Sequence, residues 1–260
     1  MKLWTLAGSV GIALLLGALP AAAPATVTAA PARAPITNTP RIPARAGVHN
    51  IGWASSNWSG YAITGSTYNS ITGSWVVPSV TSSSGIEYSS CWIGIDGFNN
   101  SDLIQTGTEQ DASSNGATSY AAWWEILPAS ETVIPSMTIS PGDHMSASIH
   151  NNFNGTWTIT ITDNTTGQSY TTTQAYSGPG QSAEWITEAP EVNGSIATLA
   201  NYGETTFDGT VNGGNPFLVS NDGGVMIQNN QQVSTPSNPD SDTDGFNVSY
   251  GSVAPAAPAS

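Results

Sequence analysis

Residues 92–127 read WIGIDGFNNSDLIQTGTEQDASSNGATSYAAWWEIL and place polar side chains inside some of the most apolar and aromatic sequence of the chain. Residues 92–97 alternate as a β-strand does and end in a turn. Gln105 directly follows two aliphatic residues, and Glu125 directly follows two tryptophans. A buried amide or carboxyl costs several kcal/mol unless it is hydrogen-bonded, so such groups are either held in a polar network or positioned for chemistry. This stretch is therefore predicted to lie at the centre of the fold.

A second stretch of the same kind covers residues 183–190, which read AEWITEAP. It places Glu184 beside a tryptophan, and Glu188 follows four residues later in the same segment. Gln105, Glu125 and Glu184 are the leading candidates for chemistry, because each is a polar group within an apolar strand pattern. The alternative for each of them is a hydrogen-bonded polar group on the face of a sheet.

The sequence from residue 53 to residue 250 consists of short runs of β-branched and aromatic residues separated by turn residues. The runs predicted to be strands are 74–77, 89–96, 119–127, 144–150, 156–162, 168–173, 182–187, 205–211, 216–220 and 246–250. Residues 163–167, which read DNTTG between two threonine-rich runs, predict a hairpin. No run has the period of a convincing helix. This pattern predicts an all-β fold, a sandwich of two antiparallel sheets of the concanavalin-like jelly-roll kind.

The charges are divided along the chain. All four Lys and Arg residues lie before residue 46, and all eighteen Asp and Glu residues lie after it. A domain with this balance repels nucleic acid and anionic membranes. Protonation at about pH 3 to 4 would remove much of the charge, given reference pKa values of about 3.9 for Asp and 4.3 for Glu. The composition therefore predicts a protein adapted to acid, and the alternative is an acidic surface kept for solubility.

The sequence divides into four predicted regions. Residues 1–25 carry a lysine, an apolar run and small residues suited to cleavage, which predicts a signal peptide rather than a membrane anchor. Residues 26–49 are rich in Ala, Pro and Thr and are interpreted as a propeptide or linker. The folded domain is predicted over residues 50–250, followed by a disordered tail over residues 251–260. These regions indicate a secreted, extracellular protein, expected to be a monomer without membrane attachment once mature.

The predicted propeptide holds the arginines that remain after removal of a signal peptide, Arg33, Arg41 and Arg45. At neutral pH these cations are expected to be attracted to the acidic domain and to be released in acid. The alternative is a disordered spacer with no such role.

The sequence lacks the residues that several other kinds of chemistry require. Cys91 is the single cysteine, so no intramolecular disulfide is possible, and its strand context predicts a buried, inert thiol. The sequence has no HExxH motif, no nucleophile elbow and no glycine-rich phosphate loop. Residues 240–245 resemble the start of a calcium loop, but Gly251 stands where a bidentate glutamate belongs. We therefore predict no metal and no cofactor, and interpret residues 240–245 as an acidic turn.

Five motifs, taken together and in this order, resemble the glutamic peptidases called eqolisins, in particular their bacterial branch. The motifs are Asn57-Trp58-Ser59-Gly60-Tyr61, Trp92-Ile93-Gly94-Ile95-Asp96-Gly97, Ile104-Gln105-Thr106-Gly107, Ala122-Trp123-Trp124-Glu125 and Ala183-Glu184-Trp185-Ile186-Thr187-Glu188. The resemblance implies a sandwich of two large antiparallel sheets. It also implies a secreted acid endopeptidase that acts on polypeptides through a glutamine, a glutamate and an activated water.

By motif, the catalytic glutamine falls on Gln105 and the catalytic glutamate on Glu184, with Glu188 as the less favoured choice. The glutamate would take a proton from water and return it to the departing amine, while the glutamine amide would stabilise the oxyanion. Four further residues match positions that line or brace the substrate cleft, namely Trp92, Asp96, Trp123 and Glu125. Leu127 departs from the fungal pattern, which carries tyrosine there, so a hydroxyl of the main specificity pocket would be missing.

Two other functions are compatible with a sandwich rich in tryptophan. A glycoside hydrolase would use a pair of carboxyl groups, and a carbohydrate-binding module would use the nine tryptophans as stacking platforms. Gln105 distinguishes these alternatives from the peptidase, because an amide cannot replace a carboxyl in a glycosidase pair.

Overall fold

The computed structural model describes residue 1, residues 36–43 and residues 52–260. The predicted signal peptide beyond its first residue, Arg33 and Arg45 lie outside the described residues. A structural unit extends from Ala34 to Ser260, so it begins earlier than the predicted domain boundary at residue 50. Among the residues that the structure describes, no helix is long and apolar enough to cross a membrane.

Residues 36–43 and 52–260 contain β-strands and one short 3₁₀ helix, Ser220–Asp222. The strands are β1 (Ile36–Thr37), β2 (Trp53–Ser55), β3 (Trp58–Thr64), β4 (Ser70–Val76), β5 (Ile86–Ile95), β6 (Ile104–Ser113), β7 (Thr118–Ile126), β8 (Thr132–Val133), β9 (His144–Asn151), β10 (Thr156–Asp163), β11 (Gln168–Ala175), β12 (Ser182–Glu188), β13 (Glu191–Val192), β14 (Ser195–Ile196), β15 (Glu204–Val211), β16 (Gly223–Gln228), β17 (Gln231–Pro236) and β18 (Gly245–Tyr250). The predicted all-β fold is confirmed.

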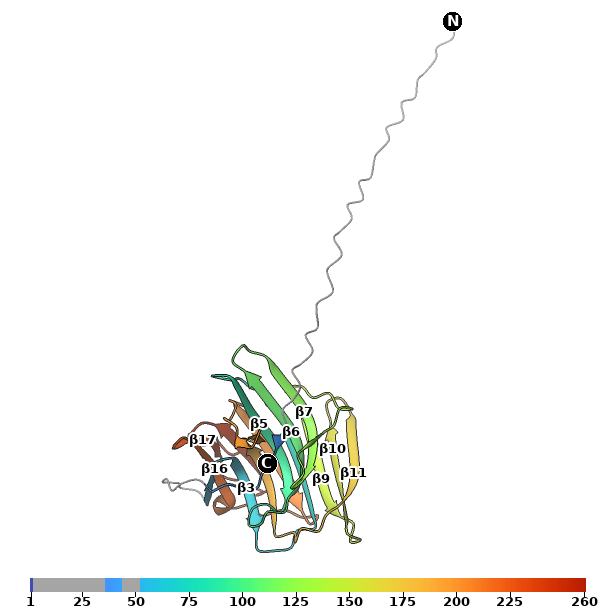
Figure 1. Cartoon of the computed structure of the whole chain (residues 1–260), viewed down its shortest axis with the longest axis vertical. Helices are drawn as coiled ribbons and strands as arrows, with labels where there is room; N and C mark the ends of the chain where they lie inside the picture. Colours follow the sequence, from blue (N-terminus) through green and yellow to red (C-terminus); the bar gives the residue numbers. More distant parts are fainter. Residues whose placement is uncertain (2–35, 44–51) are drawn as a thin grey trace. The chain divides into compact units, whose positions relative to one another are not determined.

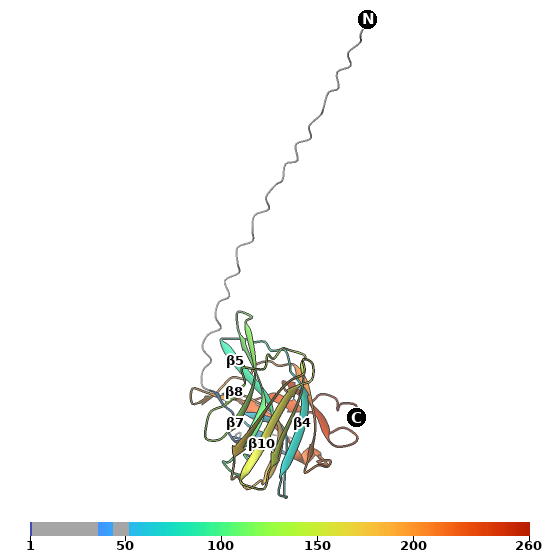
Figure 2. The ribbon, with the colours of Figure 1, turned by 90° about the vertical axis from the view of Figure 1, so that its right-hand side faces the viewer.

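The longer strands form two layers that are joined at one edge. The first layer contains β16, β3, β12, β5, β6, β7 and β8 in spatial order, and the second contains β11, β10, β9, β4, β15, β18 and β17. β16 and β17 pair as an antiparallel hairpin, so one hydrogen-bonded path runs through both layers. The layers meet where β4 and β9 pack on β5, and where β9 and β10 pack on β6 (Figures 1 and 2). The predicted sandwich is confirmed, with continuous rather than separate sheets.

Alternation decides which side chains of β10 are buried. Its tryptophan and two isoleucines point into the core, and its threonines point to the opposite side. There they pair with hydroxyls of β11 through hydrogen bonds of 3.2, 3.0 and 2.8 Å, in the pairs Thr158–Thr173, Thr160–Thr171 and Thr162–Ser169. In the connecting turn, Asp163 Oδ1 accepts a hydrogen bond from the Thr165 N–H at 2.9 Å. The predicted hairpin over residues 163–167 is therefore confirmed.

The first layer carries apolar side chains on both of its faces. Its inner face joins the second layer in a large core that includes Trp75, Trp157, Trp185, Phe207 and Phe246. Its opposite face holds a smaller cluster formed by Trp53, Trp58, Ala62, Trp92, Leu103, Trp123 and Ile186. Because side chains alternate along β12, Trp185 points into the large core, while its neighbours Glu184 and Ile186 point toward the smaller cluster.

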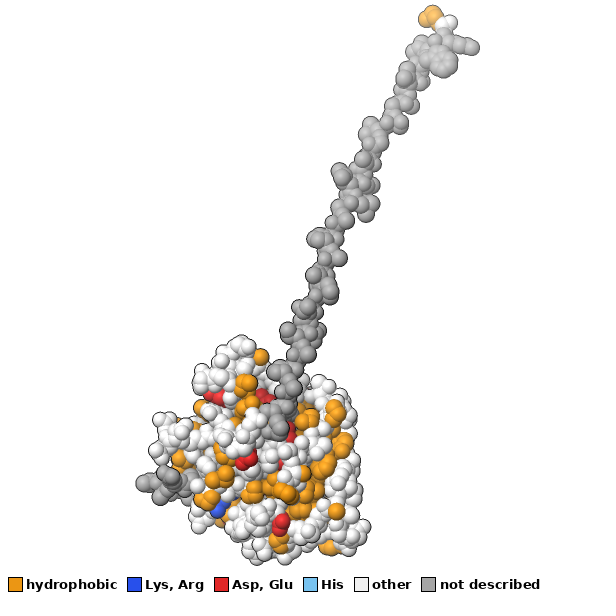
Figure 3. Space-filling model, in the orientation of Figure 1, with side chains coloured by type: hydrophobic (Ala, Val, Ile, Leu, Met, Phe, Trp, Pro, Cys, Tyr) orange, Lys and Arg blue, Asp and Glu red, His pale blue; other side chains and the backbone are white. Residues whose placement is uncertain are grey.

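Most carboxyl groups do not lie on the surface. The buried ones are Glu87, Asp96, Glu109, Asp111, Glu125, Asp143, Asp163, Glu184, Glu188 and Asp240. Figure 3 accordingly shows few charged side chains on the face in view, among uncharged polar atoms and hydrophobic patches. An acidic surface kept for solubility does not account for this distribution, because burial works against the charged form of a carboxyl group.

Two segments differ from the sequence-based expectation. Residues 216–220 form no strand, because the Asn215 side chain accepts a hydrogen bond from the Phe217 N–H at 2.6 Å and Phe217 adopts a φ of 54°. The strand prediction there was wrong. Residues 251–260 follow β18 without further secondary structure, and the Ala256 carbonyl accepts a hydrogen bond from Asn247 Nδ2 at 3.0 Å. The boundaries of the four predicted regions stay predictions.

Candidate active site

The pairing of four neighbouring strands places the candidate residues in one row. Glu184 of β12 is opposite Gly94 of β5, Gly94 is opposite Gln105 of β6, and Gln105 is opposite Glu125 of β7. Residues that are directly paired point to the same face of a sheet. The three polar side chains are fully buried there, with exposures of 0%. The structure thus brings together the two stretches that the sequence singled out.

Gln105 and Glu125 are in direct contact. Gln105 Nε2 donates a hydrogen bond to Glu125 Oε2 at 2.7 Å. Burial raises the pKa of Glu125 to about 9, although hydrogen bonds from the Asn38 N–H and from Gln105 oppose that increase. Glu125 is therefore a neutral acid at acidic pH, and it fixes the Gln105 amide with one oxygen.

Glu184 lies at the other end of the row, and one strand, β5, separates it from Gln105. Two strand spacings separate their Cα atoms by about 10 Å. The position between them is Gly94, where an added Cβ would come within 2.8 Å of the Trp92 ring and 3.4 Å of Gln105 Cβ. Burial raises the pKa of Glu184 well above its usual range, the Ser182 hydroxyl opposes that increase, and nearby Asp96 adds to it. The pairing of Gln105 with Glu184 stays a prediction.

Glu188 lies on the same face as Glu184, about 13 Å further along β12. Trp92 Nε1 donates to Glu188 Oε2 at 2.9 Å, and Asn57 Nδ2 donates to Glu188 Oε1 at 3.1 Å. Burial raises the pKa of Glu188 well above its usual range, and the charge of Glu125 raises it further. Two donors, an indole and an amide, thus hold the carboxyl group of Glu188.

Residues 36–43, part of the predicted propeptide or linker, lie directly on these groups. The Asn38 carbonyl accepts a hydrogen bond from Gln105 Nε2 at 2.7 Å, and the Asn38 N–H donates to Glu125 Oε2 at 3.0 Å. Thr39 Oγ1 accepts from Asn57 Nδ2 at 3.2 Å. Asn57 therefore contacts both this segment and Glu188.

Two of these residues carried no role in the sequence-based prediction. Asn57 stands in one of the five motifs, and its signal was an amide directly before a tryptophan. Asn38 lies in low-complexity sequence that offers no signal for a site. Sequence reasoning missed Asn38 because only the folded chain brings it against Gln105.

Tryptophans and one required glycine form the walls of the site. The rings of Trp58 and Trp92 meet edge to face, with centroids 4.9 Å apart. Gly107 of β6 pairs with Trp92 of β5 on one side and with Trp123 of β7 on the other. A Cβ added at Gly107 would lie 2.3 Å from a backbone oxygen and 2.5 Å from Trp92 Cβ. Leu127, which replaces the tyrosine of the fungal pattern, packs against this cluster. The cleft-lining role of Trp92 and Trp123 stays a prediction.

Asp96 braces a loop beside the row. It adopts a φ of 72°, and its carboxylate accepts four hydrogen bonds of 2.8 to 2.9 Å. The donors are Asn100 Nδ2, the Tyr176 hydroxyl and the N–H groups of Gly180 and Gln181. These contacts fix the loop that leads into β12, the strand that carries both candidate glutamates.

Replacing Asp96 with Asn tests this role. Asparagine tolerates the left-handed backbone conformation, but it has one acceptor oxygen instead of two, so buried donors lose their partner. We expect the free energy of unfolding to fall by about 2 to 4 kcal/mol. Urea unfolding of both proteins measures the change. Tyr176→Phe, which removes one hydroxyl donor and keeps the ring and the Asp96 carboxylate, is the milder control, and equal losses for the two variants would contradict the bracing role.

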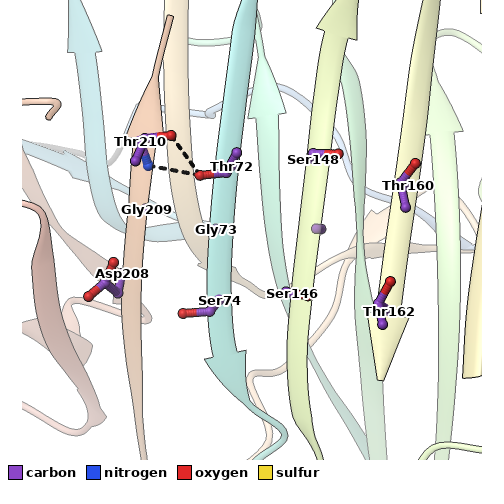
Figure 4. A pocket seen from close by; sticks show the side chains of 11 residues that line it. Thr72, Gly73, Ser74, Ser146, Ser148, Thr160, Thr162, Asp208, Gly209 and Thr210 are labelled. Atoms are coloured by element: carbon purple, nitrogen blue, oxygen red, sulfur yellow. Dashed lines mark hydrogen bonds between the residues drawn. The ribbon is translucent and has the colours of Figure 1, made fainter. Parts of the chain in front are cut away.

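A different groove lies on the outer side of the second layer and carries only hydroxyl groups and one acid (Figure 4). It has a volume of about 360 Å³, and its Thr72 and Thr210 hydroxyls are hydrogen-bonded at 2.8 Å. At its acidic end, Asp208, Asp240 and Asp244 offer oxygens within 4.8 Å of one another. Asp240 Oδ1 already accepts the N–H of Asp244 at 3.2 Å, as an acidic turn requires. This groove contains none of the amide and glutamate pairs described above.

Cys91 lies on the face of β5 that packs into the large core. It is fully buried, and burial raises the pKa of its thiol to about 12. A thiol with this pKa is a poor nucleophile, in agreement with the predicted inert role.

Comparison with known proteins gives matches over most of this domain. A model described as the Peptidase A4 family matches residues 56–250. Aspergillopepsin-2 of Aspergillus niger is 34% identical over 177 residues, which are 59% of this chain and 62% of that protein. Scytalidopepsin B of Scytalidium lignicola is 31% identical over 114 residues, 44% of this chain and 42% of that protein. The matches therefore span less than two thirds of the length of either relative.

The fold is also similar to a solved structure. The crystal structure of scytalido-glutamic peptidase with a transition state analog inhibitor superposes with a TM-score of 0.62 at 27% identity. The match covers 75% of this chain and 98% of that chain. The similarity thus extends over nearly the whole of that chain and three quarters of this one.

Proposed function

Because the chain belongs to the peptidase A4 family, whose members are the eqolisins, we propose that it is an acid endopeptidase acting on polypeptides. One observation carries the proposal. A backbone carbonyl, that of Asn38, rests on the Gln105 amide within a buried network of glutamine and glutamate. A peptide bond held in this way is presented to the groups that hydrolysis requires. The glycosidase and carbohydrate-binding alternatives are not favoured.

The proposed mechanism uses one amide and one carboxyl group. A glutamate of β12 in its ionised form takes a proton from water, and the water oxygen attacks the carbonyl carbon. The Gln105 N–H stabilises the oxygen that becomes negative. The glutamate then returns the proton to the amine as the C–N bond breaks. Glu125 holds the amide in position and stays protonated in acid.

Two glutamates of β12 are candidates for the carboxyl group. The motif favours Glu184, which is fully buried. The contacts favour Glu188, since Asn57 bonds both Glu188 and Thr39, the residue after the carbonyl held by Gln105. We therefore rank Glu188 first and retain Glu184 as the second candidate.

The sequence also supports a proposal for how the enzyme matures and where it acts. We propose that residues 1–25 are a signal peptide, that residues 26–49 are a propeptide, and that the mature monomer works outside the cell. Support comes from the apolar run with its small residues and from a domain without Lys or Arg after residue 45. The raised pKa of Glu125 keeps this group uncharged in acid, which fits work at low pH.

Digestion of a denatured protein at pH 3.5 tests the proposed activity. The wild type should release peptides, and Gln105→Ala should lower kcat by about 10² to 10³-fold, as removal of one oxyanion donor does. Released peptides are measured by chromatography, in parallel with reducing sugar from a mixture of polysaccharides. Release of sugar without peptides would favour the glycosidase instead.

A further inference from the structure

Two aromatic side chains from different parts of the chain form a clamp beside the candidate site. Trp53 belongs to β2 and Phe98 to the loop between β5 and β6, and their rings meet edge to face with centroids 5.4 Å apart. Trp53 belongs to the smaller apolar cluster, and Phe98 packs against it. That cluster also contains Trp92 and Trp123. The aromatic clamp, defined as Trp53 and Phe98, therefore lies on the same side of the first layer as Gln105.

The domain holds both rings of the clamp in place. Trp53 Nε1 donates a hydrogen bond to the Asp222 carbonyl at 2.8 Å. A Cβ added at Gly224 would lie 2.0 Å from the Trp53 ring, so only glycine leaves room for the ring there. The Phe98 N–H donates to Ser182 Oγ at 3.4 Å, at the start of the strand that carries both candidate glutamates. The clamp is thus tied to the candidate site through β12.

A cation lies in the clamp. The Arg41 guanidinium is 4.4 Å from the centroid of the Phe98 ring and 5.9 Å from that of the Trp53 ring. Arg41 Nη1 also donates to the Ala54 carbonyl at 3.4 Å. Among the described residues, Arg41 is thus bound by rings and a carbonyl, and not by the carboxylates that the sequence-based prediction expected to attract it.

An aromatic clamp is suited to bind cations in acid. A ring attracts a cation through its quadrupole, which does not titrate, whereas a carboxylate loses its charge when it is protonated. The sequence has no Lys or Arg after residue 45, so the domain cannot fill the clamp with such a side chain of its own. A guanidinium or ammonium group in the clamp therefore comes from the first 45 residues or from another polypeptide.

The distance from the candidate site to the clamp can be counted in residues. The Asn38 carbonyl accepts a hydrogen bond from the Gln105 amide, and Arg41 follows three residues later. Directly after Arg41, the Ile42 N–H donates to Asn57 Oδ1 at 2.9 Å, which fixes this register. A polypeptide that places a carbonyl on Gln105 and follows the same path brings the third side chain after that carbonyl to the clamp.

We propose that Trp53 and Phe98 form a subsite that selects substrates with arginine or lysine at the third residue after the bond that is cut. This inference rests on the proposed function, with Gln105 as the amide that receives the carbonyl. The two rings act on the binding of the substrate and not on the reacting atoms. Arginine should be favoured over lysine, because its planar guanidinium stacks on aromatic rings.

Matched peptides that differ in one charge test the subsite. Quenched peptides carry either arginine or citrulline, its uncharged analogue of the same shape, at the third place after the cut. Mass spectrometry of the products fixes the bond that is cut. At pH 3.5 the full chain should cut the arginine peptide with a kcat/KM about two- to fivefold higher, the range for a cation over a ring. Arginine placed one residue earlier or later should give no such advantage.

The pH dependence separates the rings from the acidic groups of the domain. The ratio of the two kcat/KM values should stay constant from pH 3 to pH 5, whereas recognition by a carboxylate would raise the ratio as that group ionises. Phe98→Leu should bring the ratio toward one, and Phe98→Trp should keep or increase it, because tryptophan is the best ring for a cation. Phe153→Leu, in the turn between β9 and β10, is the matched control and should keep the wild-type ratio.

The results distinguish this inference from the proposed function. If both peptides are cut equally well, or if arginine is favoured equally at every place, the subsite is overturned and the proposed function stands. A ratio that rises with pH, or that Phe98→Leu leaves unchanged, also overturns the subsite. If a denatured protein is digested while neither peptide is cut, its mapped cuts decide, and cuts placed without regard to arginine and lysine overturn the subsite. If nothing is cut at pH 3.5, both proposals are overturned.

Discussion

Replacing Glu188 with Gln is expected to lower kcat for peptide hydrolysis by about 10⁴-fold or more, whereas Glu184→Gln should cost less than about tenfold. The amide has nearly the same shape as the carboxyl group, but it cannot take a proton from water. Asn57 donates to Glu188 and also to Thr39, the residue after the carbonyl that Gln105 binds, and no such contact is found for Glu184 among the described residues. Initial rates on a quenched peptide at pH 3.5 measure both variants.

The double variant provides the control. If Gln105 and Glu188 act on one water, Gln105→Ala combined with Glu188→Gln should be little slower than Glu188→Gln alone. Circular dichroism of each variant checks that the sheets are retained. A large loss for Glu184→Gln with a small one for Glu188→Gln would return the assignment to the glutamate that the motif favours.

The stability of the fold is expected to fall steeply as the pH rises. Glu125 has a folded-state pKa of about 9 against an ordinary value of 4.5, and burial also raises the pKa of Glu184 and Glu188. The folded state therefore binds more protons than the unfolded state above pH 4.5. The resulting stabilisation is fully present below about pH 4.5 and is lost as the pH rises through the folded pKa values.

The size of this effect follows from the number of pH units crossed. Between pH 4.5 and 7.5, each such carboxyl removes at most about 4 kcal/mol from the free energy of unfolding. Urea unfolding at a series of pH values in low salt measures the change. Glu125→Gln should flatten the curve, because an amide does not titrate. Equal or higher stability at pH 8 than at pH 4 would contradict the role of the buried carboxyls.

Strands with plain alternation could be predicted from the sequence, and strands without it could not. β10 alternates threonine with apolar residues, so its two faces are visible in the sequence. β6 is buried on both faces and includes Glu109, Gln110 and Asp111. Because these residues are polar, the sequence pattern did not indicate a buried central strand there. Residues 216–220 show the opposite error, because local turn geometry overrides an apolar run.

The polar groups of the site could be predicted, but not their arrangement. Gln105 and Glu125 stand out because each interrupts an apolar run. Their contact depends on the register between β6 and β7, which no local sequence pattern determines. Glu184 and Glu188 are four residues apart on one strand and therefore point to the same face, so a motif alone cannot choose between them. The choice needs partners such as Asn57, which come from elsewhere in the fold.

Asn57 contacts both Thr39 and Ile42, and this has a consequence for substrate access. While these contacts hold, residues 36–43 occupy the Gln105 amide and one oxygen of Glu125, so a polypeptide substrate cannot reach these groups. The segment belongs to the same chain, so dilution of the protein does not change how strongly it competes with a substrate. The rate on an added polypeptide would then depend on release of this segment as well as on bond breaking.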